Sequence, residues 1–108
     1  SPAGYFDKDG AMAAMEILTF RLGVAMDETD FLALDRRVQT EFIPNHAGFL
    51  RRTTMRSASG EWAVVSLWRS EDDAVSSARL GADDGLFHQF MASMEPGTVD
   101  RRTYDTLD

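Results

Sequence analysis

The chain has 108 residues, 44% of them hydrophobic and 27% charged, a composition typical of one soluble globular domain with a small core. Its net charge of −7 argues against nucleic acid or an anionic membrane surface as the main partner. The sequence has no cysteine, which excludes disulfides and thiolate chemistry and suits the cytoplasm, and its apolar runs fall short of the ~20 residues of a membrane span.

The N-terminal part of the chain predicts a tail followed by a strand. Residues 1–14 are rich in Gly, Ala and Asp and lack the pattern of a signal peptide. We therefore expect a tail over residues 1–14, partly vector-derived, and a single domain over residues 15–108. Residues 15–26 place Leu18, Phe20 and Leu22 on one face of an extended chain, and this period of two predicts a strand.

A helix is predicted next, over residues 29–43. Asp27 and the polar residues after it supply an N-cap and first-turn carboxylates, which suit the positive end of a helix dipole. Apolar residues follow at helical spacing, and these are Phe31, Leu34, Val38 and Phe42. Pro44 then ends the helix, because proline cannot continue it.

Two strands are predicted at residues 49–56 and 62–68, joined by a short hairpin loop at residues 57–60. The second strand is apolar on both faces: Trp62, Val64 and Trp68 point one way, and Ala63, Val65 and Leu67 point the other. An antiparallel strand with one wet face alternates apolar and polar residues, so this strand should be central and covered on both sides.

The last part of the chain predicts an interrupted helix and a final strand. Ser70 caps the helix, with Asp73 completing a pattern like a capping box. The buried face begins with Ala74, Val75 and Ala78, and residues 81–85 interrupt the helix. It restarts through residues 86–94 and ends at Pro96, before a strand over residues 98–107.

The element order β-α-β-β-α-β predicts an α+β, ferredoxin-like fold, with four antiparallel strands and two helices on one face. The other face would leave apolar side chains of residues 62–68 in water. Burying each of them stabilises a protein by about 1.5–3 kcal/mol. A second copy related by a two-fold axis is the simplest cover, so we expect a homodimer whose sheets meet face to face or close into a barrel.

Several segments are similar to a known superfamily: PNHAGF at residues 44–49, WRSEDDA at residues 68–74, the Phe87-His88 pair, and Tyr104 in the last strand. Over about residues 15–107 the chain resembles the dimeric α+β-barrel proteins, in particular the antibiotic biosynthesis monooxygenase-like domains. Some of these are oxygenases that use neither metal nor flavin and oxidise polycyclic aromatic substrates between sheet and helices. The resemblance implies no cofactor, no metal and a small hydrophobic or aromatic ligand.

The resemblance also implies site residues. His88 or His46 would deprotonate a phenolic or quinol-like substrate. The residues implied to bind that substrate are Trp68, Phe20, Arg51, Phe87, Phe90, Met91 and Tyr104. A related branch degrades haem with an Asn on strand one, a Trp early in helix two and a later His. Residues 15–26 contain no Asn and no aromatic lies around Ser77, so haem degradation is not expected.

Each of these residues also has a structural interpretation. His88 can cap the core, His46 can be a surface turn residue, and the aromatic and Met side chains can simply pack on the sheet. The two His residues lack the spacing of a zinc site. The alternative function is therefore a non-catalytic ligand-binding or assembly domain. A pocket of about 300 Å³ or more with convergent polar groups would favour chemistry, whereas a space filled by aromatic rings would favour the structural role.

Overall fold

Residues 12–107 fold as three helices and a short π-helical turn against one β-sheet. A computed structural model describes residues 12–107, so most of the tail expected at residues 1–14 lies outside the described part. The elements in chain order are β1 (Ala14–Phe20), α1 (Glu28–Arg37), η1 (Val38–Phe42), β2 (Phe49–Arg56), β3 (Trp62–Trp68), α2 (Glu71–Ala82), α3 (Gly85–Ala92) and β4 (Asp100–Asp105).

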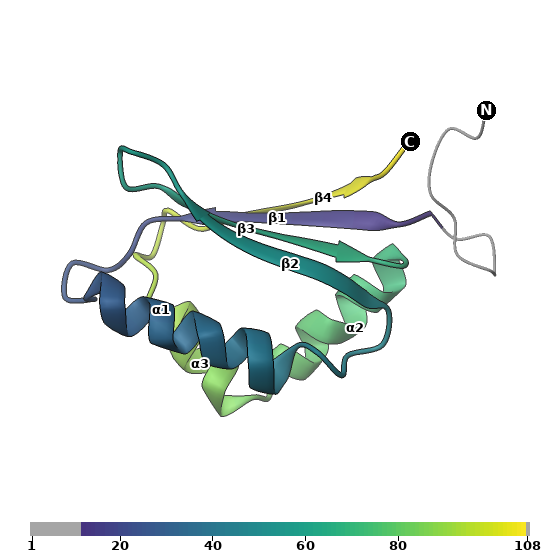
Figure 1. The fold of residues 1–108 in the computed structure, drawn as a ribbon, viewed down its shortest axis with the longest axis horizontal. Helices are drawn as coiled ribbons and strands as arrows, with labels where there is room; N and C mark the ends of the chain where they lie inside the picture. Colours follow the sequence, from purple (N-terminus) through teal and green to yellow (C-terminus); the bar gives the residue numbers. More distant parts are fainter. Residues whose placement is uncertain (1–11, 108) are drawn as a thin grey trace.

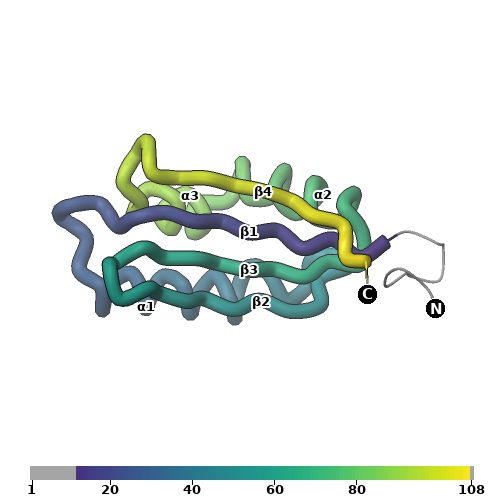
Figure 2. Tube along the Cα trace, turned by 90° about the horizontal axis from the view of Figure 1, so that it is seen from above, coloured from purple at the N-terminus to yellow at the C-terminus, as the bar shows by residue number. Residues whose placement is uncertain are grey.

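The sheet has four strands in the order β2-β3-β1-β4, and every neighbouring pair is antiparallel. All helices lie on one face of it (Figure 1), with α1 under the β2 side and α2 and α3 under the β4 side (Figure 2). This is the ferredoxin-like α+β fold predicted from the element order. The predicted central position of β3 is also confirmed, because β3 pairs with β2 and β1.

The prediction for the first strand was wrong at its C-terminal end. β1 ends at Phe20 instead of continuing to residue 26. Beyond it, Leu22 makes only an isolated bridge to Met94, the Gly23 N–H donates to the Ser93 carbonyl at 2.8 Å, and Val24 is fully exposed. This segment crosses to the end of α3 instead of pairing with β3 and β4. Its alternating sequence therefore does not form a strand.

The first helix begins as predicted but changes its winding. Asp27 caps it, with Oδ1 accepting from the Thr29 N–H at 2.7 Å. The expected helix over residues 29–43 becomes π-helical at η1, where the Ile43 N–H donates to the Val38 carbonyl at 3.0 Å. Such wide turns are rare and often occur near functional sites. Here the wide turn precedes Pro44.

The interrupted second helix is confirmed as two helices. Ser70 caps α2 by accepting from the Asp73 N–H at 3.2 Å, and Asp84 caps α3 by accepting from the Phe87 N–H at 2.8 Å. Val75 was wrongly expected in the buried face of α2: its side chain is exposed, whereas Ala74 and Ser77 are buried. β4 is shorter than the predicted residues 98–107.

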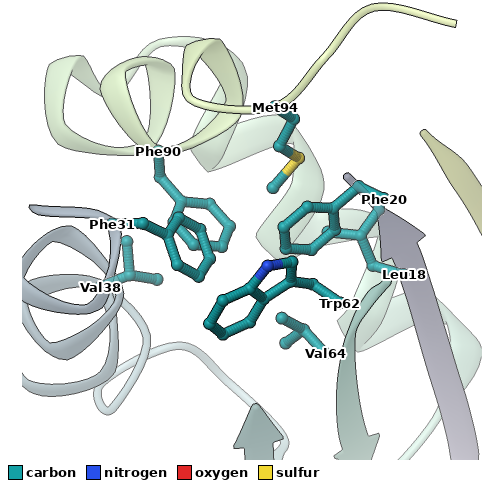
Figure 3. Packing of buried hydrophobic residues seen from close by; sticks show 8 residues of the cluster. All are labelled: Leu18, Phe20, Phe31, Val38, Trp62, Val64, Phe90 and Met94. Atoms are coloured by element: carbon teal, nitrogen blue, oxygen red, sulfur yellow. The ribbon is translucent and has the colours of Figure 1, made fainter. Parts of the chain in front are cut away.

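The main core lies between α1, α3 and the sheet and is rich in aromatic rings (Figure 3). Phe31 packs edge-on against Trp62 with ring centroids 4.8 Å apart, and stacks on Phe90 at 5.6 Å. A second, smaller cluster of Ile43, Trp68 and Ala74 lies towards α2. The gap between the two clusters holds the polar groups described below.

The opposite face of the sheet is apolar along its central strands β1 and β3, and no helix of residues 12–107 covers it (Figure 1). Cross-strand pairs on this face include Met15 with Leu67 and Ile17 with Val65. A shallow depression of about 220 Å³ on it is lined by Met15, Arg51, Thr53, Val65 and Leu67. Within the described part of the chain, no helix is both long enough and apolar enough to cross a membrane.

Candidate functional site

A small cavity of about 30 Å³ lies between the sheet and the helices. This volume has room for about one water molecule or one hydroxyl group. Its apolar lining is Leu18, Phe42, Ile43, Val64, Trp68, Ala74, Ala78, Phe87 and Phe90, and its polar lining is Glu16, Arg52, Ser66, Ser77 and Arg101. Convergence of so many polar groups beside aromatic rings is unusual for a core and typical of a ligand site.

A larger groove of about 340 Å³ adjoins this cavity. It runs between α2 and the inner face of β1 and β4, and is lined by Glu16, Glu71, Ala74, Val75, Ala78, Arg79, Ala82, Arg101 and Thr103. Cavity and groove share the lining residues Glu16, Ala74, Ala78 and Arg101. The wall between them therefore consists of small alanine side chains and an ion pair whose Arg101 Nε and Glu16 Oε2 atoms lie 3.7 Å apart.

Arg52 is the buried cation of the site. Its side chain is 3% exposed, and Nη2 lies 2.8 Å from Oδ1 of Asp35, which also accepts from the Thr54 hydroxyl at 3.0 Å. Nη1 donates to Gln39 Oε1 at 3.2 Å, and the guanidinium lies 5.4 Å from the centroid of the Phe90 ring. These contacts hold a planar, permanently charged group at a fixed place beside the aromatic wall.

Ser77 and His46 form a hydrogen-bonded pair at the cavity. Ser77 Oγ and His46 Nδ1 are 2.6 Å apart, and the imidazole packs edge-on against Phe42 with ring centroids 4.3 Å apart. Burial lowers the pKa of His46 from its ordinary value of 6.5, although the negative charge of Asp84 acts in the opposite direction. His46 is therefore neutral at pH 7 and able to accept a proton.

The lowered pKa of His46 predicts a pH dependence of stability. Below pH 6.5 the unfolded chain binds a proton at His46 before the folded chain does. The free energy of unfolding of the wild type, relative to His46→Gln, should therefore fall as the pH drops below 6.5 towards the lower pKa of the folded state, and stay constant above 6.5. Urea unfolding between about pH 5 and 8 measures this difference, and a flat difference would contradict it.

Trp68 contributes a free hydrogen-bond donor. Its side chain is almost fully buried, and its Nε1 is the one buried side-chain nitrogen or oxygen of residues 12–107 without a hydrogen-bond partner. An indole N–H can only donate. A ligand oxygen that reaches it gains a hydrogen bond and relieves a buried unpaired group, which is worth about 1–3 kcal/mol.

The structure brings some of the residues predicted from the sequence to the cavity. Trp68, Phe87 and Phe90 line it, and His46 reaches it through Ser77. Phe20 instead packs in the main core, with its ring centroid 5.6 Å from that of Phe31.

The remaining predicted residues lie elsewhere. Met91 packs on the outside of the main core, and Arg51 lines the open face of the sheet. Tyr104 is exposed and pairs with Met15 on that same face. His88 is exposed on α3, and its Nε2 lies 2.5 Å from the Ala82 carbonyl. None of these four side chains lines the cavity.

The polar lining was missed in the sequence, although it left a signal there. Glu16 shares the inward phase of β1 with Leu18, and Ser66 shares that of β3 with Val64 and Trp68. Asp35 is likewise a carboxylate on the buried side of α1. A polar residue at an inward position is costly unless it is paired or functional. The inward positions of these residues in the strand and helix patterns could therefore have identified them as candidate site residues.

The fold has well-matched counterparts among solved structures. A variant of SnoaB, a cofactor-independent oxygenase from Streptomyces nogalater, superposes with a TM-score of 0.74, 14% identity and coverage of 89% of this chain and 94% of that one. A proposed antibiotic biosynthesis monooxygenase from Bordetella bronchiseptica has a TM-score of 0.72 and 16% identity, over 90% of this chain and 99% of that one. A third, from Caulobacter crescentus, has a TM-score of 0.61 and 20% identity, over 91% and 92%.

Sequence comparison adds no relative: no protein-family model and no curated protein matches the chain. At 14–20% identity, the structural likeness establishes the fold. The chain has the α+β fold of the antibiotic biosynthesis monooxygenase-like proteins, as its sequence resemblance implied.

Proposed function

We propose that the protein is a cofactor-independent oxygenase acting on a small aromatic or quinol-like substrate. The observation that carries this proposal is the groove of about 340 Å³ beside a polar cavity. The groove has the size of a small-molecule site, and the cavity beside it is lined by Arg52, Trp68 and Ser77, the last of which is hydrogen-bonded to His46. The fold shared with a cofactor-independent oxygenase supports the same reading.

The chemistry requires no bound redox group. A substrate with an acidic hydroxyl, or a ring CH₂ beside a carbonyl, forms an anion that can itself reduce dioxygen. Oxidation of CH₂ to C=O releases four electrons and two protons, so one oxygen atom enters the product and the other leaves as water. Arg52 and the Trp68 N–H would stabilise the anion, since donors fixed in a dry site favour developing negative charge.

The base in this proposal is His46, because it is neutral and hydrogen-bonded to a cavity-lining residue. His88 has an exposed side chain outside the cavity lining, so it has no part in the proposed chemistry. The rings of Phe87 and Phe90, which line the cavity, would exclude water from the substrate hydroxyl.

The direct test uses anthrone and naphthohydroquinone as probes under ¹⁸O-labelled dioxygen. We expect the protein to accelerate conversion of anthrone to anthraquinone above its rate in buffer, with one labelled oxygen per product and no added cofactor. Oxidation at the buffer rate with both probes, or an absolute requirement for an added reductant, would contradict the proposal.

Ala78 offers a test of where the substrate binds. Ala78 lines both the groove and the cavity, so Ala78→Leu should narrow the passage between them. If the steric cost in this passage is about 1–3 kcal/mol, as for overpacked cores, and falls on the bound substrate, kcat/KM for anthrone should fall roughly five- to 150-fold. Ala92→Leu, the same change at an exposed position on α3, is the control and should retain activity. Equal activity of the two variants would place the substrate elsewhere.

A second candidate function is non-catalytic ligand binding. It is favoured by the volume of the inner cavity, about 30 Å³, which is a tenth of what a small ligand needs. In that case the groove alone would bind an aromatic ligand. Titration with anthraquinone, followed by tryptophan fluorescence, would then show binding while the labelled-dioxygen assay shows no turnover.

We also propose that two copies of the chain pair through the open face of the sheet. Val65 lies at the middle of this face, and a carboxylate there would be desolvated on pairing. Val65→Asp should therefore convert a dimer into a monomer in analytical ultracentrifugation. Leu32→Asp, at an exposed position on α1, is the control and should leave the mass unchanged. A wild-type monomer at micromolar concentration would contradict the pairing.

A further inference from the structure

We propose that Ser77 and His46 form a proton relay, in which Ser77 takes a proton from a substrate hydroxyl in the cavity and passes its own to His46. This inference rests on the proposed function and deepens it. It assigns the contact with the substrate to Ser77, while His46 acts from behind it. It also narrows the substrate class to molecules with an ionisable O–H, either a phenol or the enol form of a ring ketone.

The position of Ser77 fits contact with a substrate. It lies on the inner face of α2, one turn after Ala74 and next to Ala78, and all three side chains line the cavity. The residue is 6% exposed. A hydroxyl group that enters through the passage at Ala74 and Ala78 reaches Ser77 on the same helix face. The cavity of about 30 Å³ admits that hydroxyl but no ring, so the ring stays in the groove.

The position of His46 suits a base that holds the transferred proton during the reaction. Its turn is held by backbone hydrogen bonds, with the His46 N–H donating to the Ile43 carbonyl at 3.1 Å and the Phe49 N–H donating to the His46 carbonyl at 3.2 Å. Packing against Phe42 fixes the ring plane. The residue is half-buried. Its imidazole does not line the cavity and reaches it only through Ser77.

The charged groups near this pair make it the better base of the site. Asp84, the N-cap of α3, favours a positive charge on His46. Asp73, in the first turn of α2, faces the same loop at Gly48. Within the cavity, Glu16 is the competing base, but its Oε2 atom lies 3.7 Å from the Arg101 guanidinium. A carboxylate is ordinarily a weaker base than an imidazole.

The proton transfer is balanced and moves no electrons. The substrate O–H bond breaks, a new O–H bond forms at Ser77 Oγ, and the original serine proton bonds to His46 Nδ1. The products are a substrate anion, a neutral serine and an imidazolium. Dioxygen then takes the electrons of the anion. The stored proton returns through Ser77 to the oxygen atom that leaves as water.

The first arm of the test needs no turnover. The relay requires His46 to accept at Nδ1, so near pH 7 its proton must be on Nε2. Proton–nitrogen NMR correlations of the imidazole should show this Nε2–H tautomer in the wild type. In Ser77→Ala the Nδ1 resonance and the pKa of His46 should both change. His88→Ala, outside the site, should change neither. A wild-type Nδ1–H tautomer would overturn the relay, because His46 would then donate to Ser77.

The second arm measures the pH profile of kcat with anthrone. Ser77→Ala should lower kcat by about a hundredfold or more and remove the limb that follows His46 ionisation. Ser77→Thr, which keeps a hydroxyl, should restore both in part, while Glu16→Gln should keep the limb. A wild-type profile in Ser77→Ala, or loss of the limb in Glu16→Gln, would overturn the relay. If the wild type turns over neither probe, the proposed oxygenation fails, and the tautomer and His46 titration still decide the hydrogen-bond direction on which the relay depends.

Discussion

Arg52→Met should destabilise the protein by about 3–5 kcal/mol, because it leaves the buried carboxylate of Asp35 without its cation. The pair is almost completely shielded from solvent: the Arg52 side chain is 3% exposed and the Asp35 side chain 12%, and Nη2 lies 2.8 Å from Oδ1. Among residues 12–107, only the Thr54 hydroxyl would remain bonded to that carboxylate. The measurement is the free energy of unfolding from urea titration at one fixed protein concentration.

The neighbouring arginine supplies the matched control. Arg51 lies on the open face and is exposed, so Arg51→Met should change stability by less than about 0.5 kcal/mol. Replacing both partners, as Asp35→Leu with Arg52→Met, should recover most of the loss, because no uncompensated charge is then buried. A loss below 1 kcal/mol in the single variant would mean that Asp35 finds another partner or water.

Gly48→Ala should destabilise the protein by about 3 kcal/mol, from backbone strain and overpacking together. Gly48 has φ of +77°, in the left-handed region, and an added Cβ would lie 2.6 Å from the Cβ of Asp73. That atom is fixed to the backbone of α2, so rotation of the Asp73 side chain cannot relieve the contact. The same substitution should move the turn that carries His46 away from Ser77.

Gly97 separates the strain from the contact. It has φ of +87°, but an added Cβ there meets no atom within 4 Å. Gly97→Ala should therefore cost only the backbone strain, about 1–2 kcal/mol, and leave the imidazole resonances of His46 unchanged. Equal losses in the two variants, measured by urea unfolding, would show that the contact with Asp73 is relieved at no cost.

The inner cavity matches neither of the two outcomes expected from the sequence, which were an open pocket of about 300 Å³ with polar groups and a space filled by aromatic rings. Aromatic rings nearly fill it, as the structural role requires, yet five of its lining residues are polar and a groove of about 340 Å³ adjoins it. The site is therefore divided: the groove has space for a ring, and the cavity has space only for one polar group.

The sequence by itself determined the order of elements, both strands of the central hairpin and the caps at Asp27 and Ser70. These features depend on residues close together in the chain, through side-chain periodicity and local hydrogen bonds. It also indicated the unpartnered apolar face, because Ala63, Val65 and Leu67 alternate with the inward residues of β3. The alternating pattern predicted the strand wrongly at Leu22 and Val24, because the alternation continues after β1 has ended at Phe20.

Only the tertiary structure decided which polar groups meet. Asp35 and Arg52 lie on different elements, and His46 and Ser77 are 31 positions apart. The first pair forms only when α1 packs against β2, and the second only when the turn before β2 packs against α2. Periodicity shows which face of an element is buried, but the packing of distant elements decides what faces it there. For that reason the fold could be predicted from the sequence, whereas the Ser77–His46 pair could not.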